Sequence, residues 1–239
     1  MKYIEENVLV RYQSLFQHFS NTVIAKQQRM AFAVRRVAKS DTNNVMAFLK
    51  RTFFMHEPLY KKIGYCKSEN DDCTDLDRYC RYCLPGKSYM AEDASGNIIG
   101  VLISSISSVK DSMDYRLVKS LCVDPNFKVI LDMVDVREKG AQLGVKYPNE
   151  KKLFEIIFAA TDDNWLNRGV MKKLMEEAEK KAREKGLRLM RIDTTSAYSA
   201  KAAEKMGFKC IYKRAYRDIN LIIPDPPHEY DQVYIKEFN

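Results

Sequence analysis

The segment from Leu153 to Gly186 most constrains the fold, because it combines a buried strand, a tight turn and a long amphipathic helix. The strand is predicted over Leu153–Ala160, whose nearly continuous apolar residues are typical of a strand covered on both faces. Gly169 lies in the turn, and Gly186 lies where a C-terminal cap is expected. The helix between the two glycines places these apolar residues on one face: Met171, Leu174, Met175, Ala178 and Ala182.

A strand that leads directly into a helix leaves several backbone N–H groups unpaired. Together with the positive end of the helix dipole, these groups can form an anion site. The turn here, Asn164–Val170, contains a single glycine and the basic Arg168. A single glycine is a weak motif, so the segment also fits a strand–turn–helix joint that binds nothing.

Length and charge restrict the class of protein. The 239 residues suit one large domain, and the sequence contains no repeats or low-complexity tracts. The net charge of +8 favours an acidic ligand such as a nucleotide, but the basic residues are interleaved with acids and form no groove for nucleic acid. No stretch is long and apolar enough to span a membrane, and Met1–Asn7 does not resemble a secretion signal. We therefore expect a cytoplasmic, monomeric protein without nucleic-acid or membrane partners.

The remaining patterns predict one α/β domain around a mixed sheet, over residues 31–239, preceded by a helical arm over residues 1–30. Further strands are predicted at Ala31–Val37, Ser88–Glu92, Ile98–Ser105, Lys119–Val123, Leu187–Thr194, Phe208–Tyr216 and Gln232–Phe238. Further helices are predicted after an N-cap at Asp41 and at Asp71–Cys83, Val129–Leu143 and Ser199–Met206. Pro58 is expected to end or redirect the first of these helices.

Four of the six cysteines lie close together, at Cys66, Cys73, Cys80 and Cys83. A structural zinc site usually needs two close ligand pairs, and only Cys80 and Cys83 form such a pair. On a helix they share a face with Leu76. We therefore predict ordinary reduced thiols and no metal.

Three motifs carry a resemblance to a known family. The order of elements, with the Gly169 turn before the central helix and Met206-Gly207-Phe208 after a short one, resembles the GNAT superfamily of acetyl-CoA-dependent N-acetyltransferases. Residues 53–59, Phe-Phe-Met-His-Glu-Pro-Leu, are similar to the Phe-Phe-x-x-Glu-Pro-Leu signature of insect arylalkylamine N-acetyltransferases, a group that includes dopamine N-acetyltransferase. Residues 195–200 with 205–208 resemble the hydroxyl-rich segment of that group.

The resemblance implies a GNAT-like fold and transfer of acetyl from acetyl-CoA to the primary amine of a small arylalkylamine, by direct attack in a ternary complex. Glu57 matches the catalytic base of the family, Ser199 matches a catalytic serine, and Thr195 stands where another hydroxyl is expected. The residues implied for acetyl-CoA are Ala159, Ala160 and Thr161 on a splayed strand, and Leu166, Asn167, Arg168, Gly169, Val170 and Met171 around the pyrophosphate.

The chemistry of the reaction supports a role for Glu57. An alkylamine has a pKa of about 10.4, so its nitrogen must lose a proton before it can attack a thioester. A carboxylate in a partly apolar pocket has a raised pKa and can accept that proton. His56 is the alternative base or lines a path for the proton, and Tyr198 is a further hydroxyl that can assist. Candidates for an aromatic slot around the substrate are Phe54, Tyr60, Tyr65 and Tyr89.

Several alternatives stay open. The superfamily turn reads Arg/Gln-x-x-Gly-x-Gly/Ala, whereas Leu166 and Met171 occupy its first and last positions here, and Ala203 replaces a tyrosine that many members have. These departures leave room for a catalytically weak acyl-CoA-binding paralogue. A non-aromatic amine such as a polyamine, or a longer acyl-CoA, is the alternative within the enzyme class. Ser199 also fits the N-cap of its helix.

Overall fold

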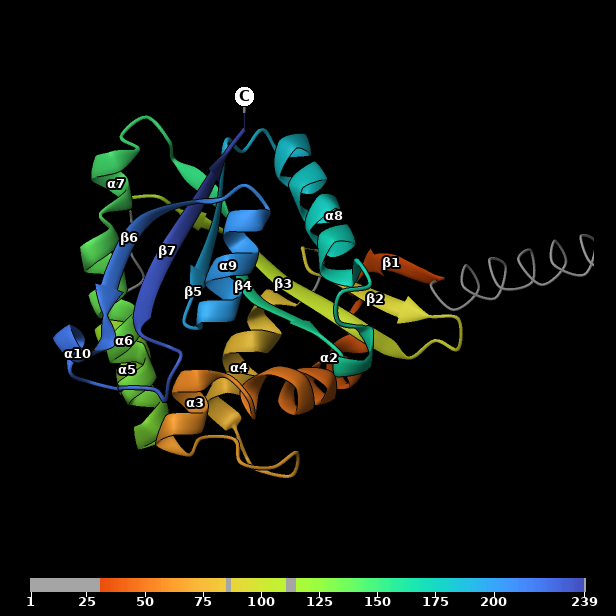
Figure 1. Ribbon diagram of the computed structural model, residues 1–239, viewed down its shortest axis with the longest axis horizontal. Coiled ribbons are helices and arrows are strands. Elements are labelled where there is room, and N and C mark those ends of the chain that lie inside the picture. Colours follow the sequence, from red (N-terminus) through yellow and green to blue (C-terminus); the bar gives the residue numbers. More distant parts are fainter. Residues whose placement is uncertain (1–30, 85–86, 111–114, 239) are drawn as a thin grey trace, which may run out of the picture.

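Seven strands form one mixed sheet in the computed structural model, which describes residues 31–84, 87–110 and 115–238 (Figure 1). The strand order is β1-β2-β3-β4-β5-β7-β6, and only β4 and β5 pair in parallel. The strands are β1 (Phe32–Arg36), β2 (Tyr89–Asp93), β3 (Ile98–Ser108), β4 (Lys152–Thr161), β5 (Leu189–Thr194), β6 (Lys209–Ala215) and β7 (Tyr230–Glu237). The predicted α/β class and mixed sheet are thus confirmed, whereas the predicted arm over residues 1–30 lies outside the described residues.

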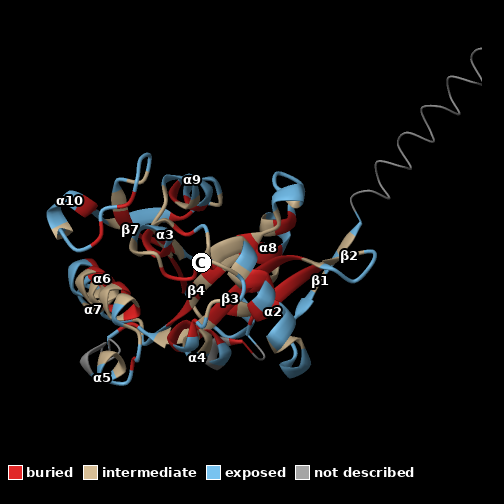
Figure 2. Ribbon diagram, turned by 90° about the horizontal axis from the view of Figure 1, so that it is seen from below, coloured by how far each residue is buried: buried red, intermediate tan, exposed pale blue. Residues whose placement is uncertain are grey.

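Helices cover both faces of the sheet (Figure 2). The pair α8 and α9 packs on one face, and α2, α4 and α6 pack on the other. The helices are α2 (Thr42–Leu49), α3 (Pro58–Ile63), α4 (Thr74–Cys83), α5 (Tyr115–Ser120), α6 (Pro125–Ala141), α7 (Leu143–Lys146), α8 (Val170–Glu184), α9 (Ala197–Lys205) and α10 (Tyr216–Ile219). A π-helical turn, Lys50–Phe54, continues α2 toward α3.

A bulge in β4 changes which face its side chains point to. Phe158 pairs with Ile103 of β3, but Ile156 pairs with the next residue of β3, so Ile157 is an extra residue in β4. Ile156 therefore packs in the cluster under α8, whereas Ile157 and Phe158 both pack in the cluster on the opposite face. The bulge thus turns the aromatic ring of Phe158 toward the face that α4 and α6 cover.

The strand predicted at Lys119–Val123 is wrong. Residues Tyr115–Ser120 form α5, in which Lys119 makes an ion pair with Asp132 of α6 at 2.6 Å. The chain then turns, and the N–H of Val123 donates to the carboxylate of Asp75 on α4 at 2.9 Å. A run of three apolar residues is too short to distinguish a strand from a helix end followed by a turn.

The ends of two predicted elements also differ from expectation. Asp41 does precede α2, but its carboxylate accepts from Arg35 at 2.6 Å and from the N–H of Ala38 at 2.7 Å instead of capping the helix. Pro58 redirects the chain, as predicted, and does so as the first residue of α3. That position tolerates proline because its N–H has no partner within the helix.

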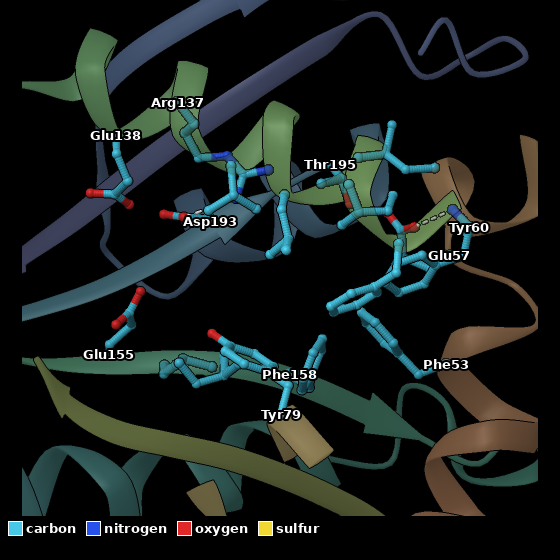
Figure 3. Close-up of a pocket in the computed structure, with 17 residues that line it drawn as sticks. Phe53, Glu57, Tyr60, Tyr79, Arg137, Glu138, Glu155, Phe158, Asp193 and Thr195 are labelled. Carbon is cyan, nitrogen blue, oxygen red and sulfur yellow. Dashed lines mark hydrogen bonds and ion pairs between the residues drawn. The ribbon is translucent and has the colours of Figure 1, made fainter. Parts of the chain in front are cut away.

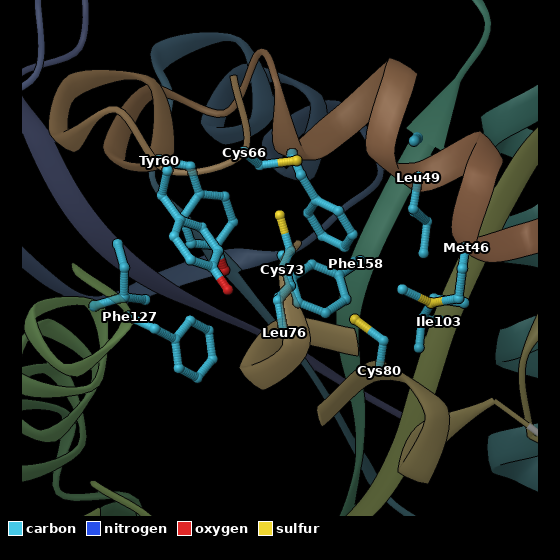
Figure 4. Close-up of a cluster of buried hydrophobic side chains, with 14 of the residues drawn as sticks. Met46, Leu49, Tyr60, Cys66, Cys73, Leu76, Cys80, Ile103, Phe127 and Phe158 are labelled. Carbon is cyan, nitrogen blue, oxygen red and sulfur yellow. The ribbon is translucent and has the colours of Figure 1, made fainter. Parts of the chain in front are cut away.

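Cysteine side chains contribute to the largest apolar cluster. Cys66, Cys73 and Cys80 are buried there beside Leu76 and Phe158 (Figure 4). Within the described ranges, no group of three or more His, Cys, Asp or Glu side chains is placed to hold a metal ion. No helix in the same ranges has both the length and the apolar character that a membrane span needs.

Candidate active site

A cavity opens between α3, α4, α6 and the facing side of β4 and β5 (Figure 3). Its aromatic lining consists of Phe53, Tyr60, Tyr79, Phe127 and Phe158. Its ionisable lining consists of Glu57, Arg137, Glu138, Glu155 and Asp193. An elongated space with rings along its sides and carboxylates at both ends suits a ligand that is both apolar and positively charged.

Glu57 lies at one end of this cavity and is only 7 % exposed. Glu57 is the N-cap residue of α3, and its side-chain Oε2 accepts from the N–H of Tyr60 at 2.8 Å. Its Oε1 is buried without a hydrogen-bond partner. Burial raises the pKa of the carboxyl group, while the Thr195 hydroxyl, backbone N–H groups and the charge of Arg137 lower it by less. One oxygen therefore orients the side chain, and the other is available to a ligand.

Thr195 reaches the same cavity from the end of β5. Arg191, Asp193 and Thr195 follow one another at alternate positions, so their side chains lie on the same face of the sheet. The phenol of Tyr216 donates to the carbonyl of Thr195 at 2.8 Å. The structure thus brings together two of the three residues that the resemblance implies for catalysis, Glu57 and Thr195.

Ser199 does not line this cavity, and it is not the N-cap of its helix. Ser196 occupies the N-cap of α9, and its Oγ accepts from the N–H of Ser199 at 3.0 Å. The Ser199 hydroxyl donates back to the carbonyl of Ser196 at 3.0 Å. The N-cap expectation for Ser199 is wrong because the N-cap lies three residues earlier, at Ser196, and a run of hydroxyl residues leaves the starting residue ambiguous.

Two alanine variants separate capping from catalysis at this helix. We expect Ser196→Ala to lower the free energy of unfolding by about 1 kcal/mol, because it removes the cap. If Ser199 acts only in the capping box, Ser199→Ala has a smaller effect on stability and leaves kcat within about twofold of Ser196→Ala. A fall in kcat of tenfold or more for Ser199→Ala alone, with unchanged thermal unfolding, assigns the hydroxyl to the reaction instead.

The strands β4 and β5 separate beside the cavity. They pair only from Phe154 to Ile156 on β4, although β4 continues to Thr161. Beyond Ile156, the backbone groups of β4 that face β5 have no strand partner on that side. Ala159, Ala160 and Thr161 lie on this separated part, as the splayed strand of the resemblance predicts.

The turn before α8 supplies the second set of residues implied for acetyl-CoA. Gly169 has φ +82° and Asn167 has φ +59°, a left-handed conformation that glycine and asparagine tolerate best. The first helical bond of α8 is donated by Lys173 to Gly169, so the N–H groups of the residues between them point out of the helix end. Leu166 and Arg168 are exposed, and Met171 packs against the cluster under α8.

Most of the residues expected around the substrate lie outside the cavity lining. Phe54 is fully buried and packs its ring against Phe158 at 5.4 Å, so it supports the cavity wall from behind. His56 is exposed, and Tyr198 is 70 % exposed beside the ring of His228. Of the candidates for an aromatic slot, only Tyr60 lines the cavity. Tyr89 packs in the cluster under α8, on the other face of the sheet.

Sequence reasoning missed most of the charged cavity wall. Glu155 interrupts an apolar strand, and Arg191 and Asp193 lie at alternate positions of another buried strand. Charged residues at such positions signal a buried ion network, because an unpaired charge in a sheet interior is costly. The aromatic lining from Phe127 and Phe158 carries no comparable signal, because these residues also fit an ordinary core.

Comparison with known proteins shows a family match for part of the chain and a shared fold for most of it. Residues 133–208 match the model of the acetyltransferase (GNAT) family. The fold is similar to that of polyamine N-acetyltransferase from Drosophila melanogaster, an enzyme that forms N-acetylagmatine, with a TM-score of 0.77 and 20 % identity over 87 % of this chain and 100 % of that one. It is also similar to arylalkylamine N-acetyltransferase 2 from Aedes aegypti, with a TM-score of 0.78 and 24 % identity over 87 % of this chain and 99 % of that one.

A more distant structure shows the same fold with a ligand. Arabidopsis thaliana NAA60 in complex with acetyl-CoA matches with a TM-score of 0.53 and 14 % identity, over 87 % of this chain and 99 % of that one. The strand separation and the Gly169 turn described above belong to the region that matches the family model, residues 133–208. Residues 133–208 therefore match the GNAT acetyltransferase family, and the described part of the chain has the fold of the insect N-acetyltransferases that its sequence resembles.

Proposed function

We propose that the protein transfers the acetyl group of acetyl-CoA to a primary amine bound in the cavity, with Glu57 as the base. The observation that carries this proposal is the free, buried Oε1 of Glu57 at one end of a cavity lined by carboxylates and rings. A protonated amine is attracted to such a site, and a carboxylate with a raised pKa can accept its proton.

The transfer is a direct displacement. The ammonium group gives one proton to Glu57, and the neutral nitrogen attacks the thioester carbon. A C–N bond forms, the C–S bond breaks, and CoA leaves as a thiolate. The nitrogen loses its second proton as the amide forms, and that proton neutralises the thiolate to the thiol. Glu57 then releases the first proton to solvent, so one amide, one thiol and one proton are produced.

Three features of this chain fit acetyl-CoA. The separated part of β4 offers unpaired backbone groups to the pantetheine arm, and the N–H groups there suit the oxyanion that forms at the thioester carbonyl. The exposed turn before α8 offers helix N–H groups and the charge of Arg168 to the pyrophosphate. Met171 packs toward the core, so its bulk does not by itself oppose binding in the turn.

We propose that the amine carries an apolar group, which the aromatic walls of the cavity cover. The five aromatic residues of the cavity lining support the arylalkylamine that the resemblance implies, because rings stack favourably on a flat substrate. The carboxylates Glu138 and Glu155 at the other end favour an amine that carries a second positive charge.

Activity is tested with the purified full chain, acetyl-CoA and a panel of amines. The panel includes 2-phenylethylamine, dopamine, hexylamine and several diamines, and product is identified by mass spectrometry while the release of CoA thiol is followed. We expect acetylated product from at least one amine. Calorimetry with CoA is the second measurement: binding without turnover of any amine supports an acyl-CoA-binding paralogue, and absence of both contradicts the proposal.

A further inference from the structure

A buried network of charges forms the end of the cavity opposite Glu57. Figure 3 shows Glu138 and Glu155 at that end, with Asp193 and Arg137 between them and Glu57. Glu155 projects from β4 and Glu138 from α6, so two different elements bring the carboxylates to one place. The side chains of Glu138 and Glu155 are 16 % and 20 % exposed, which leaves both accessible from the cavity.

This network contains more negative than positive groups. Arg137 pairs with Asp231 at 2.9 Å and with Asp193 at 3.0 Å. Arg191 pairs with Asp193 at 2.8 Å, contacts Glu138 closely and lies 3.9 Å from Glu155. Two guanidinium groups thus serve four carboxylates, and no other Lys or Arg of the described ranges makes an ion pair with them.

Of the four carboxylates in this network, Glu155 has the negative charge that is least neutralised by a nearby guanidinium group. Its other contact is a hydrogen bond from the hydroxyl of Ser107, which carries no charge. Burial raises the pKa of Glu155, and the nearby negative charges of Asp193 and Glu138 raise it further, whereas Arg191 lowers it. A cation that enters the cavity beside Glu155 relieves this repulsion, because opposite charges attract strongly where water is excluded.

We propose that Glu138 and Glu155 form a second cation subsite, so that the preferred substrate has a positive group at each end, as in a diamine or an aminoguanidine. The inference rests on the proposed function and narrows its substrate class: one amine is acetylated at Glu57, while the distal cation binds between Glu138 and Glu155. The free Oε1 of Glu57, in the same cavity, is the independent sign that this space is built for a cation. The aromatic side walls then cover the alkyl chain between the two charges.

The test compares amines of equal size that differ in the distal charge. Cadaverine and hexylamine have the same number of heavy atoms, and the series from 1,3-diaminopropane to 1,6-diaminohexane, each with its monoamine of equal size, covers the unknown spacing. We expect the best diamine to exceed its monoamine at least tenfold in kcat/KM. Glu155→Gln, which keeps the size and removes the charge, should lower kcat/KM for that diamine by about 10- to 100-fold. The same variant should keep kcat/KM for the monoamine of equal size within about twofold of the wild-type value.

Control variants separate recognition from folding. Glu155→Asp keeps the charge and should retain most of the preference, and Glu138→Gln should reduce it independently. Glu176→Gln, at an exposed position on α8, should change kcat/KM for neither the diamine nor the monoamine. The subsite proposal is overturned if Glu155→Gln and Glu138→Gln each lower kcat/KM equally for the diamine and the monoamine. It is also overturned if the wild type prefers monoamines. Turnover of 2-phenylethylamine without a diamine preference overturns the subsite alone, whereas no turnover of any amine overturns the proposed function.

Discussion

Glu57→Gln is expected to lower kcat/KM for the best amine by about 100- to 10,000-fold at neutral pH, because glutamine cannot accept the proton of the ammonium group. The variant keeps the side-chain oxygen that accepts from the N–H of Tyr60, so α3 should stay capped. It also removes a carboxylate whose pKa burial has raised, which means that the ionised group destabilises the fold at neutral pH. The variant should therefore unfold at the same or a higher temperature than the wild type.

The pH profile gives this prediction a second readout. Glu57 is active as a carboxylate, and its pKa is raised above the ordinary 4.5, so wild-type kcat/KM should fall as the pH drops through the raised value. That limb should be absent from the residual activity of Glu57→Gln. Glu69→Gln, at an exposed position in the loop after α3, serves as the matched control and should behave like the wild type. Unchanged turnover in Glu57→Gln at neutral pH would remove Glu57 from the mechanism.

Arg137→Met is expected to lower the free energy of unfolding by about 3–5 kcal/mol, the largest stability effect that we predict. Arg137 is 7 % exposed and joins α6 to two strands through Asp193 on β5 and Asp231 on β7. Asp231 is fully buried, and the substitution leaves its charge without a partner. An uncompensated charge in the protein interior costs far more than the lost attraction alone.

The control for Arg137 lies on the same helix. Lys139 pairs with Asp135 at 2.5 Å, but its side chain is 70 % exposed, so Lys139→Met should cost less than about 1 kcal/mol. Both variants are measured by urea unfolding. The double variant Arg137→Met with Asp231→Leu should recover part of the loss, because it removes the orphaned charge. Similar losses for Arg137→Met and Lys139→Met would show that the buried network contributes little to stability.

Local patterns in the sequence determined much of the fold. A nearly continuous apolar run identified the strand at β4, and period-3.6 spacing identified the long helix α8. Two strand-like segments around a short turn identified the hairpin of β2 and β3. Gly169 was recognisable because the turn needs a positive φ. Glu57, flanked by rings and a proline, was recognisable as a candidate base from its motif. The strand predicted at Lys119–Val123 failed because its hydrogen-bond partner, Asp75, lies 48 residues away in the chain.

The cavity itself was decided only by the tertiary structure. A bulge in β4 turns Phe158 toward α4, and the early end of the ladder with β5 opens the strands, but neither depends on a pattern that the chain shows locally. The charged wall joins α6, β4, β5 and β7, elements distant in sequence, and its excess of carboxylates exists only once they are packed together. Burial and the sum of neighbouring charges are properties of an arrangement in space, and for that reason the residues alone could name a base but not the pocket that it serves.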